Sequence, residues 1–544
     1  MMEARALLAA TLLLPLVLLL ACVSPRLRER MPALLALAPL PALGAALLAV
    51  GGPPLSLPPA LLRVTLSLDL PGAMLLGAAA LLWIAAGAHA AVDLRGKSHR
   101  ARFAVWWLLT LTGNLGVFLA ADLASFYLFF ALVSLSAYGL VAHDGTSRAG
   151  RAGGIYVGLA LLGEAALLMG FVLLAAATPG DSLLIRDAVG ALPASPWCDA
   201  TLALLIAGFG LKIGLVPLHV WMPLAYSAAP FPASAVMSGA AVKAGVIGLI
   251  RFLPLGSVQP DWGGALAALG LLSAFYGVAV GITQRNPKTV LAYSSVSQMG
   301  LLSAVFGMGL AAGDAGTASA ASFYAAHHVL VKGGLFLALA VVTRTNAHRP
   351  WPVLVPAAVL ALGLGGLPLT GGALAKWAVK APLGDGAVGL LATLSAAGST
   401  LLMLHFLHTL ETTASNDAGH DVPAGLFAPW LATAFAAVAV PWALFLTVAH
   451  GNLHDVLAPP ALWKALWPVA IGTVLAVALR RFGHDLPRIP EGDVVAAAER
   501  AARAVWGWGE ALERADALLR QWPAAVVSFL AVAALLGSVM LARP

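Results

Sequence analysis

Charged side chains are scarce in this sequence. Asp, Glu, Lys and Arg together make up 10% of its 544 residues, whereas 60% are hydrophobic and the mean hydropathy is +0.91. Soluble domains carry about 25% charged residues, so this composition excludes an ordinary soluble domain. Apolar stretches long enough to cross a bilayer as a helix recur along the chain. We therefore expect an all-α polytopic membrane protein.

Signals for cofactors are also scarce. The two cysteines, Cys22 and Cys198, lie too far apart for a CxxC metal or redox site. The sequence contains no Walker A, GxGxxG or HExxH motif. We therefore predict no cofactor and no metal. The net charge of +7 gathers in particular loops, which indicates membrane topology rather than a nucleic-acid partner.

Windows of about 20 apolar residues predict about 14–16 transmembrane helices. Sixteen candidate spans lie near 4–22, 33–51, 73–93, 104–121, 122–142, 154–177, 200–220, 231–252, 264–283, 290–312, 320–342, 352–371, 386–409, 427–449, 461–479 and 524–541. The first could be a signal peptide, but its length and the SPRLRER that follows favour an uncleaved helix.

Basic residues are concentrated in the odd-numbered loops between these spans. The residues that follow this pattern are Arg26, Arg28, Arg30, Arg95, Lys97, Arg100, Arg102, Arg148, Arg151, Arg285, Lys288, Arg344 and Arg349. Positive residues stay on the cytoplasmic side, so we expect these loops in the cytoplasm and the amino terminus outside. A bacterial cytoplasmic (inner) membrane is the expected location.

Ionisable residues lie deep inside several of the predicted spans. They are Glu164, Lys212, Lys243, Lys332, Lys376, Lys380, His327, His328, His405 and His408. A charge at the bilayer centre costs several kcal/mol unless it is paired or hydrated, which favours a functional role. Lys332 and Lys380 are equally consistent with side chains that snorkel to the interface. Burial disfavours the charged form of a lysine, and histidine titrates near neutral pH, so these residue types suit proton transfer.

Two predicted spans are interrupted close to a lysine. Pro217 follows Lys212 in the seventh span, and Pro368 precedes Lys376 in the twelfth. A broken membrane helix is tolerated only where the freed backbone groups face protein or water. The pattern favours two inverted five-helix repeats whose broken helices meet near the midplane. Two unrelated kinks are the alternative.

These features divide the chain into four parts. N-terminal helices occupy 1–99, the two repeats occupy 100–252 and 253–410, and further helices occupy 411–544. Within the last part, 488–522 alternates in charge and carries small apolar residues at helical spacing, which predicts an amphipathic cytoplasmic helix.

Several segments resemble one family of membrane proteins. They are GFGLKIGLVPLHVWMPLAYSAAP, SAVMSGAAVKAGVIGLIRF, NPKTVLAYSSVSQMG, HHVLVKGGLFL and GLPLTGGALAKWAVK, in the family's order across roughly 100–410. They resemble the antiporter-like, proton-conducting membrane subunits of respiratory complex I, group 4 hydrogenases and multisubunit sodium/proton antiporters. The resemblance implies partner membrane subunits and movement of protons or sodium.

The resemblance also implies roles for individual residues. Lys212 and Lys243 match the lysines of the seventh and eighth helices, and Lys376 matches the lysine or glutamate of the broken twelfth. His328 and Lys332 match the H-x-x-x-K of the eleventh helix. In the family these groups form a hydrophilic axis for protons. His219 and Trp221 match a PLHxWLP segment that shapes the helix break as plausibly as it serves chemistry.

One position departs from the family pattern. Ala131, in FYLFFALVSLSAYGL, falls where the family has the glutamate that pairs with the seventh-helix lysine. At 1.5 Å per residue, Glu164 lies about 15 Å into its span and Lys212 about 17 Å into its own. Both are near the middle of a core about 30 Å thick. We therefore expect Glu164 to replace the missing carboxylate.

Three functions remain open from the sequence. The first is a proton-translocating subunit of a NADH:quinone oxidoreductase-like, hydrogenase-like or antiporter complex, in which any redox chemistry belongs to the partners. The second is a proton-flux subunit for inorganic-carbon accumulation. The third is a non-conducting structural homologue, which Ala131 would favour. The retained lysines favour conduction.

Overall fold

The computed structural model describes residues 2–56, 64–345, 350–414, 422–449, 451–483, 487, 489–496, 499–501, 513–514 and 517. The chain forms two compact units, Met1–Glu491 and Gly492–Pro544. The helices and strands below all belong to the first unit.

Thirteen helices within the described residues are long and apolar enough to cross a membrane. They are α1 (Met2–Ala21), α4 (Leu70–Asp93), α5 (Arg100–Leu119), α6 (Leu123–Val141), α7 (Ser147–Ala177), α9 (Cys198–Ile213) with α10 (Trp221–Ala228), α11 (Phe231–Val236) with α12 (Lys243–Phe252), α13 (Pro260–Gly281), α14 (Pro287–Ala312), α15 (Thr317–Val342), α19 (Ala387–Glu411), α20 (Ala424–Thr447) and α22 (Pro459–Phe482). The prediction of an all-α polytopic membrane protein is confirmed.

Shorter elements connect or extend these helices. The short helices are α2 (Pro25–Arg30), α3 (Leu40–Leu48), α8 (Ile185–Ala191), α16 (Trp351–Gly365), α17 (Gly371–Ala378), α18 (Lys380–Leu383) and α21 (Leu453–Leu457). Single turns of 3-10 helix are η1 (Met31–Ala33), η3 (Pro179–Asp181), η4 (Leu192–Ala194) and η5 (Leu218–Val220), and η6 (Met237–Ala241) is a π-helical stretch. Strands β1 (Leu55–Ser56) and β2 (Thr65–Leu66) pair antiparallel, with Leu55 opposite Leu66.

The predicted span at 33–51 differs from the structure. Only Leu40–Leu48 of it forms an α-helix, because Pro39 and Pro41 interrupt the run and leave turns before it. The segment nevertheless runs alongside α1. A Cβ on Gly52 would lie 3.0 Å from Cβ of Ala4, near the start of α1. The continuous helix that hydropathy predicts over 33–51 is therefore present only in its second half.

Both predicted helix breaks are present. The chain leaves α9 at Gly214, with φ of 76°, and leaves α16 at Gly366, with φ of 94°. Glycine adopts this left-handed backbone without a steric penalty, so it commonly ends helices. Pro217 and Pro368 follow within three residues and prevent either helix from continuing.

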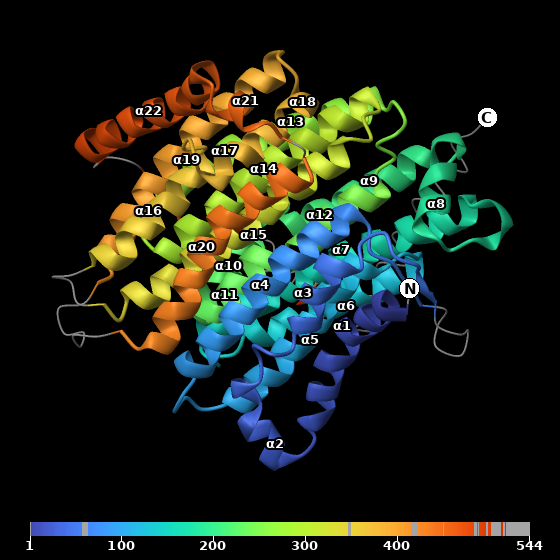
Figure 1. Cartoon of the computed structure of the whole chain (residues 1–544), viewed down its shortest axis with the longest axis horizontal. Helices are drawn as coiled ribbons and strands as arrows, with labels where there is room; N and C mark the ends of the chain where they lie inside the picture. Colours follow the sequence, from blue (N-terminus) through green and yellow to red (C-terminus); the bar gives the residue numbers. More distant parts are fainter. Residues whose placement is uncertain are drawn as a thin grey trace, which may run out of the picture. The chain divides into compact units, whose positions relative to one another are not determined.

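The most enclosed spans are Phe231–Phe252 and α15, in which the most apolar window is wholly buried. Figure 1 shows α15 near the middle of the helices, close to α10 and α4, and α22 at their edge. Polar side chains within these two windows are therefore shielded from lipid by other helices of the same chain.

Helices α13 and α14 approach each other at backbone distance. Gly263, Gly270 and Gly277 recur at seven-residue intervals on α13 and face α14. A Cβ on Gly270 would lie 2.6 Å from the carbonyl oxygen of Gly300, closer than packed atoms allow. Seven residues return to nearly the same helix face, so this glycine stripe fixes the contact along its length.

Two C-terminal predictions fall mostly or wholly outside the described residues. The candidate span at 524–541 lies outside them. Of the amphipathic helix predicted at 488–522, only 489–496, 499–501 and three single residues are described. The boundaries of the two repeats, 100–252 and 253–410, stay predictions.

Candidate functional site

A buried lysine and a buried histidine meet where α12 packs against α15. Nζ of Lys243 lies 2.7 Å from Nδ1 of His328, and both side chains are 0% exposed. Either the ammonium donates to a bare Nδ1, or a protonated Nδ1 donates to a neutral amine. The contact can therefore hold one proton in two arrangements. Lys243 follows the π-helical stretch η6, and such bulges are frequent at functional sites.

Lys332 extends this cluster along α15. It lies four residues after His328, on the same helix face. Its Nζ donates to the carbonyl oxygen of Leu291 at 2.9 Å, and its side chain is 0% exposed. Complete burial in this protein excludes snorkelling to a membrane interface for Lys332.

A second group of polar side chains lies on neighbouring helices. The Tyr324 hydroxyl donates to Oε1 of Gln298, and Nε2 of Gln298 donates to Oγ of Ser399 at 2.8 Å. These residues belong to α15, α14 and α19, and all three are buried. Sequence reasoning did not assign them a role, although polar side chains inside apolar spans were a visible signal.

Lys212 lies near the end of α9, just before the helix break. Its Nζ donates to Oγ of Ser134 on α6 at 2.8 Å, and it also lies 5.5 Å from the ring centre of Phe130. Ser134 is one turn after Ala131 on α6. A hydroxyl therefore contacts the ammonium close to the position where the family has a carboxylate. Sequence reasoning missed Ser134.

Glu164 lies on α7, which packs against α9. Its side chain is 5% exposed, and within the described residues neither carboxylate oxygen accepts a hydrogen bond. The Ser134 hydroxyl and Lys212 are among its polar neighbours. The lysine donates to the serine rather than directly to the carboxylate. A buried carboxylate in this setting is stable only if it is protonated, paired or hydrated.

The backbone places Lys212 close to the helix that carries Lys243. A Cβ on Gly245 of α12 would lie 3.0 Å from Cβ of Lys212. The absence of a side chain at Gly245 thus lets α9 and α12 approach, two residues after Lys243. The two lysines belong to helices in direct contact.

Lys376 lies on α17, after the second helix break. Its Nζ donates to the carbonyl oxygen of Gly365 at 2.6 Å. Gly365 is the last residue of α16, and carbonyl groups at a helix C-terminus stabilise a cation. The break therefore exposes a backbone acceptor that the ammonium uses.

His327 lies between the central cluster and α17. A Cβ on Gly371 would lie 2.9 Å from its Nδ1, and one on Gly372 would lie 3.2 Å from its Nε2. Neither ring nitrogen has a hydrogen-bond partner within the described part of the chain. His327 adjoins His328 in sequence and touches the helix of Lys376, so it lies between the two predicted proton-transfer groups.

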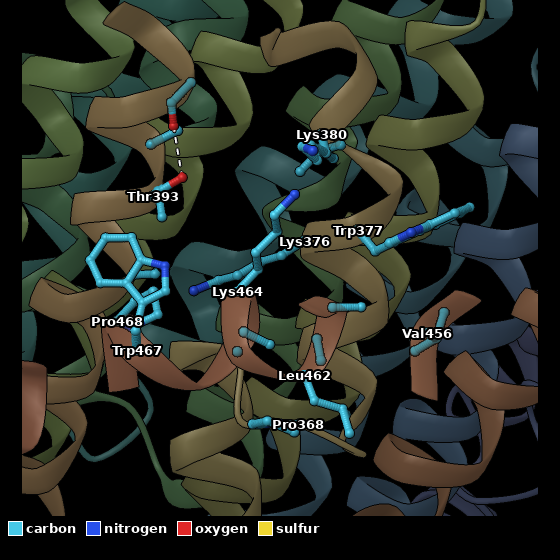
Figure 2. Close-up of a pocket in the computed structure, with 18 of the residues that line it drawn as sticks. Pro368, Lys376, Trp377, Lys380, Thr393, Val456, Leu462, Lys464, Trp467 and Pro468 are labelled. Carbon is cyan, nitrogen blue, oxygen red and sulfur yellow. Dashed lines mark hydrogen bonds between the residues drawn. The ribbon is translucent and has the colours of Figure 1, made fainter. Parts of the chain in front are cut away.

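A cavity of about 670 Å³ opens beside Lys376. Figure 2 shows Lys376 of α17, Lys380 of α18 and Lys464 of α22 around it. Lys380 lies 3.7 Å from Asp385, and their side chains are 56% and 92% exposed. Lys380 thus differs from the enclosed lysines and lies at an accessible edge.

The other residues that the sequence analysis singled out lie at the first helix break and in a second cavity. Nε1 of Trp221 donates to the carbonyl oxygen of Leu211 at 2.9 Å, which ties α10 back to α9 across the break. The ring of His219 lies 5.1 Å from that of Tyr276. His405 and His408 line a different cavity near the end of α19.

Comparisons with known proteins agree with this architecture. A family model described as NADH:quinone oxidoreductase/Mrp antiporter, TM, matches residues 120–403. An uncharacterized protein of Mycobacterium tuberculosis is 35% identical over 47% of this chain and 43% of its own length. The NADH-quinone oxidoreductase subunit N of Desulforudis audaxviator is 32% identical over 60% of this chain and 68% of its own.

A solved structure has the same fold over nearly the whole chain. It is that of the Mrp complex from Dietzia sp. DQ12-45-1b, in which one chain matches with a TM-score of 0.74 and 23% identity. The match covers 99% of this chain and 63% of that chain. The chain therefore spans less than two thirds of that protein and less than half of the mycobacterial relative.

Proposed function

This chain belongs to the NADH:quinone oxidoreductase/Mrp antiporter transmembrane family, and on that premise we propose that it translocates protons as a subunit of a larger membrane complex. One observation carries the proposal: lysines lie inside the helix bundle at four successive places. Lys212 on α9, Lys243 on α12 and Lys332 on α15 are buried, and Lys376 on α17 is half-buried beside the first cavity.

The proposed path follows contacts between these helices. Protons pass from Lys212 to Lys243 across the contact of α9 with α12. They continue to His328 over the 2.7 Å contact, with Lys332 beside it. His327 then takes up the proton and passes it to Lys376. Buried polar groups that have no protein partner usually bind internal water. Such water carries the proton over the steps that no side chain bridges.

Glu164 takes the place of the family's fifth-helix carboxylate in this proposal. Its charge favours the protonated form of Lys212 when it is ionised and disfavours it when it is neutral. Ser134, next to both groups, relays the interaction. The carboxylate has thus moved from α6 to α7 while it keeps the same lysine within reach.

The reaction that drives proton movement takes place in partner subunits. Relatives carry names of NADH-quinone oxidoreductase and F(420)H(2) dehydrogenase subunits, which favours a redox partner over inorganic-carbon accumulation. Sodium is the other ion that the family resemblance allows this chain to transport. A bacterial inner membrane with the amino terminus outside fits the distribution of arginines.

Proton flux into liposomes tests the proposal. The full chain is reconstituted and a potassium diffusion potential is applied, and internal pH is followed with and without sodium. We expect potential-driven acidification that falls about a hundredfold in Lys212→Ala and Lys376→Ala, the scale of a lost proton-transfer group. Arg95→Ala, which removes an exposed cation, is the control. Equal flux in all four proteins would reject this path and favour a non-conducting homologue.

A further inference from the structure

A second cavity, of about 660 Å³, lies at the end of the bundle opposite the Lys376 cavity. It is formed by the loop between α13 and α14 and by the C-terminal ends of α19 and α22. Its volume lies in the range of about 300–1,000 Å³ that small-ligand pockets occupy. The arginines in this loop and at the end of α22 indicate a cytoplasmic location.

Several of the side chains around this cavity are polar or basic. Arg285 and Arg480 contribute guanidinium groups, His405 and His408 contribute imidazoles, and Thr409 contributes a hydroxyl. Among the residues that the structure describes, the lining includes no aspartate or glutamate. Donors without carboxylates produce a positive potential, which favours an anionic ligand.

The two arginines are available for a ligand. Within the described residues, neither Arg285 nor Arg480 makes an ion pair, and both are exposed. They lie on different elements, the α13–α14 loop and α22, and both line the same cavity. Arginine binds phosphate through two parallel N–H donors. The site therefore suits a phosphate group in particular.

The edge of the cavity is continuous with apolar surface. Leu479 lines the cavity, and Leu475, one turn earlier on α22, is 45% exposed. Val474 and Phe482 of the same helix are 68% and 78% exposed. A ligand whose phosphate lies in the cavity thus has hydrocarbon-facing helix surface beside it.

We propose that this cavity binds the headgroup of an anionic phospholipid, with the phosphate between Arg285 and Arg480 and the acyl chains along α22. Basic pockets between membrane helices on the cytoplasmic side recognise such headgroups. The lipid joins the loop of the second predicted repeat to the peripheral helix α22. Nε2 of His405 already donates to the carbonyl oxygen of Gln284 at 2.7 Å, so the cavity wall is anchored to α19. The proposal is independent of proton conduction.

Native mass spectrometry of the full chain in detergent tests lipid binding. Phosphatidylglycerol and phosphatidylcholine are titrated separately, with inorganic phosphate as competitor. The double variant Arg285→Gln/Arg480→Gln loses two cations from the cavity. The matched control Arg26→Gln/Arg95→Gln loses two exposed cations that do not line the cavity, one on α2 and one after α4.

We expect the wild type to retain phosphatidylglycerol over phosphatidylcholine, and 10 mM phosphate not to displace it. With about 1 kcal/mol per arginine near an anionic headgroup, the cavity variant binds about 25-fold more weakly, while the control is unchanged. Equal binding by both variants would overturn the proposal. Displacement by free phosphate would assign the site to a soluble anion instead.

If the cavity variant fails to fold, photolabelling of the wild type with a photoreactive phosphatidylglycerol tests the proposal instead. We expect labelled peptides from 282–285, 404–412 and 476–483. Labelling spread over other surfaces, with none in these segments, would rule out a lipid here and leave the cavity to a partner subunit.

Discussion

Nζ of Lys243 on α12 lies 2.7 Å from Nδ1 of His328 on α15. α12 closes the first predicted repeat and α15 lies inside the second, so this contact joins the two. Two positive charges this close in a low-dielectric interior repel strongly. A single shared proton is therefore the stable arrangement, which suits the proposed transfer of protons across this contact.

Removal of the Lys243 amine tests this contact. We expect Lys243→Ala to lower proton flux in proteoliposomes about a hundredfold, because His328 then loses the amine that contacts its Nδ1. Val246→Ala, which truncates another fully buried side chain of α12, is expected to keep near-normal flux. Comparable losses in both variants would mean that packing, rather than proton exchange, explains the effect.

The proposal that Glu164 replaces the carboxylate missing at position 131 is tested by removing the first and restoring the second. Glu164→Gln is expected to abolish most flux, because Lys212 then lacks an ionisable neighbour. Adding Ala131→Glu to that variant should restore a measurable part, since Ser134 one turn away already contacts Lys212. Glu411→Gln, at an exposed position, is the control. Full flux in Glu164→Gln alone would end the assignment.

Asp93 offers a prediction about stability. Its side chain is 2% exposed and accepts from Arg344 at 2.6 Å and from Lys97 at 3.0 Å, which ties α4 to the end of α15. Asp93→Asn should lower the free energy of unfolding by about 2 kcal/mol, the value of hydrogen bonds to a charged group. Asp187→Asn, whose partner Arg186 is 82% exposed, should cost less than about 1 kcal/mol. Thermal unfolding in detergent measures both.

The glycine stripe of α13 allows a matched pair of substitutions. Gly270→Ala places a methyl group 2.5 Å from the backbone nitrogen of Ala304, so we expect a loss of about 1–3 kcal/mol. Gly264→Ala on the same helix meets nothing within 4 Å. That change should be neutral or stabilising by up to about 1 kcal/mol. A similar melting temperature for both variants would contradict the close helix contact.

The sequence predicted those features that consist of a polar residue or a proline inside an apolar span. Lys212 and Pro217 stood out because a charge and a helix breaker are costly inside a membrane, and the break lies where predicted. The irregular chain before Leu40 was missed because hydropathy measures composition and ignores where turns form. Ser134 was missed for another reason: serine is common in membrane helices, and only the packing of α6 on α9 brings it to the lysine.

The close backbone contact between α13 and α14 limits the movements that these two helices can make. Helices that touch without intervening side chains cannot slide or tilt against each other without collision. We therefore expect these two helices to move as one rigid unit if the protein changes shape. The interrupted segments at Gly214 and Gly366 are where we expect rearrangement instead.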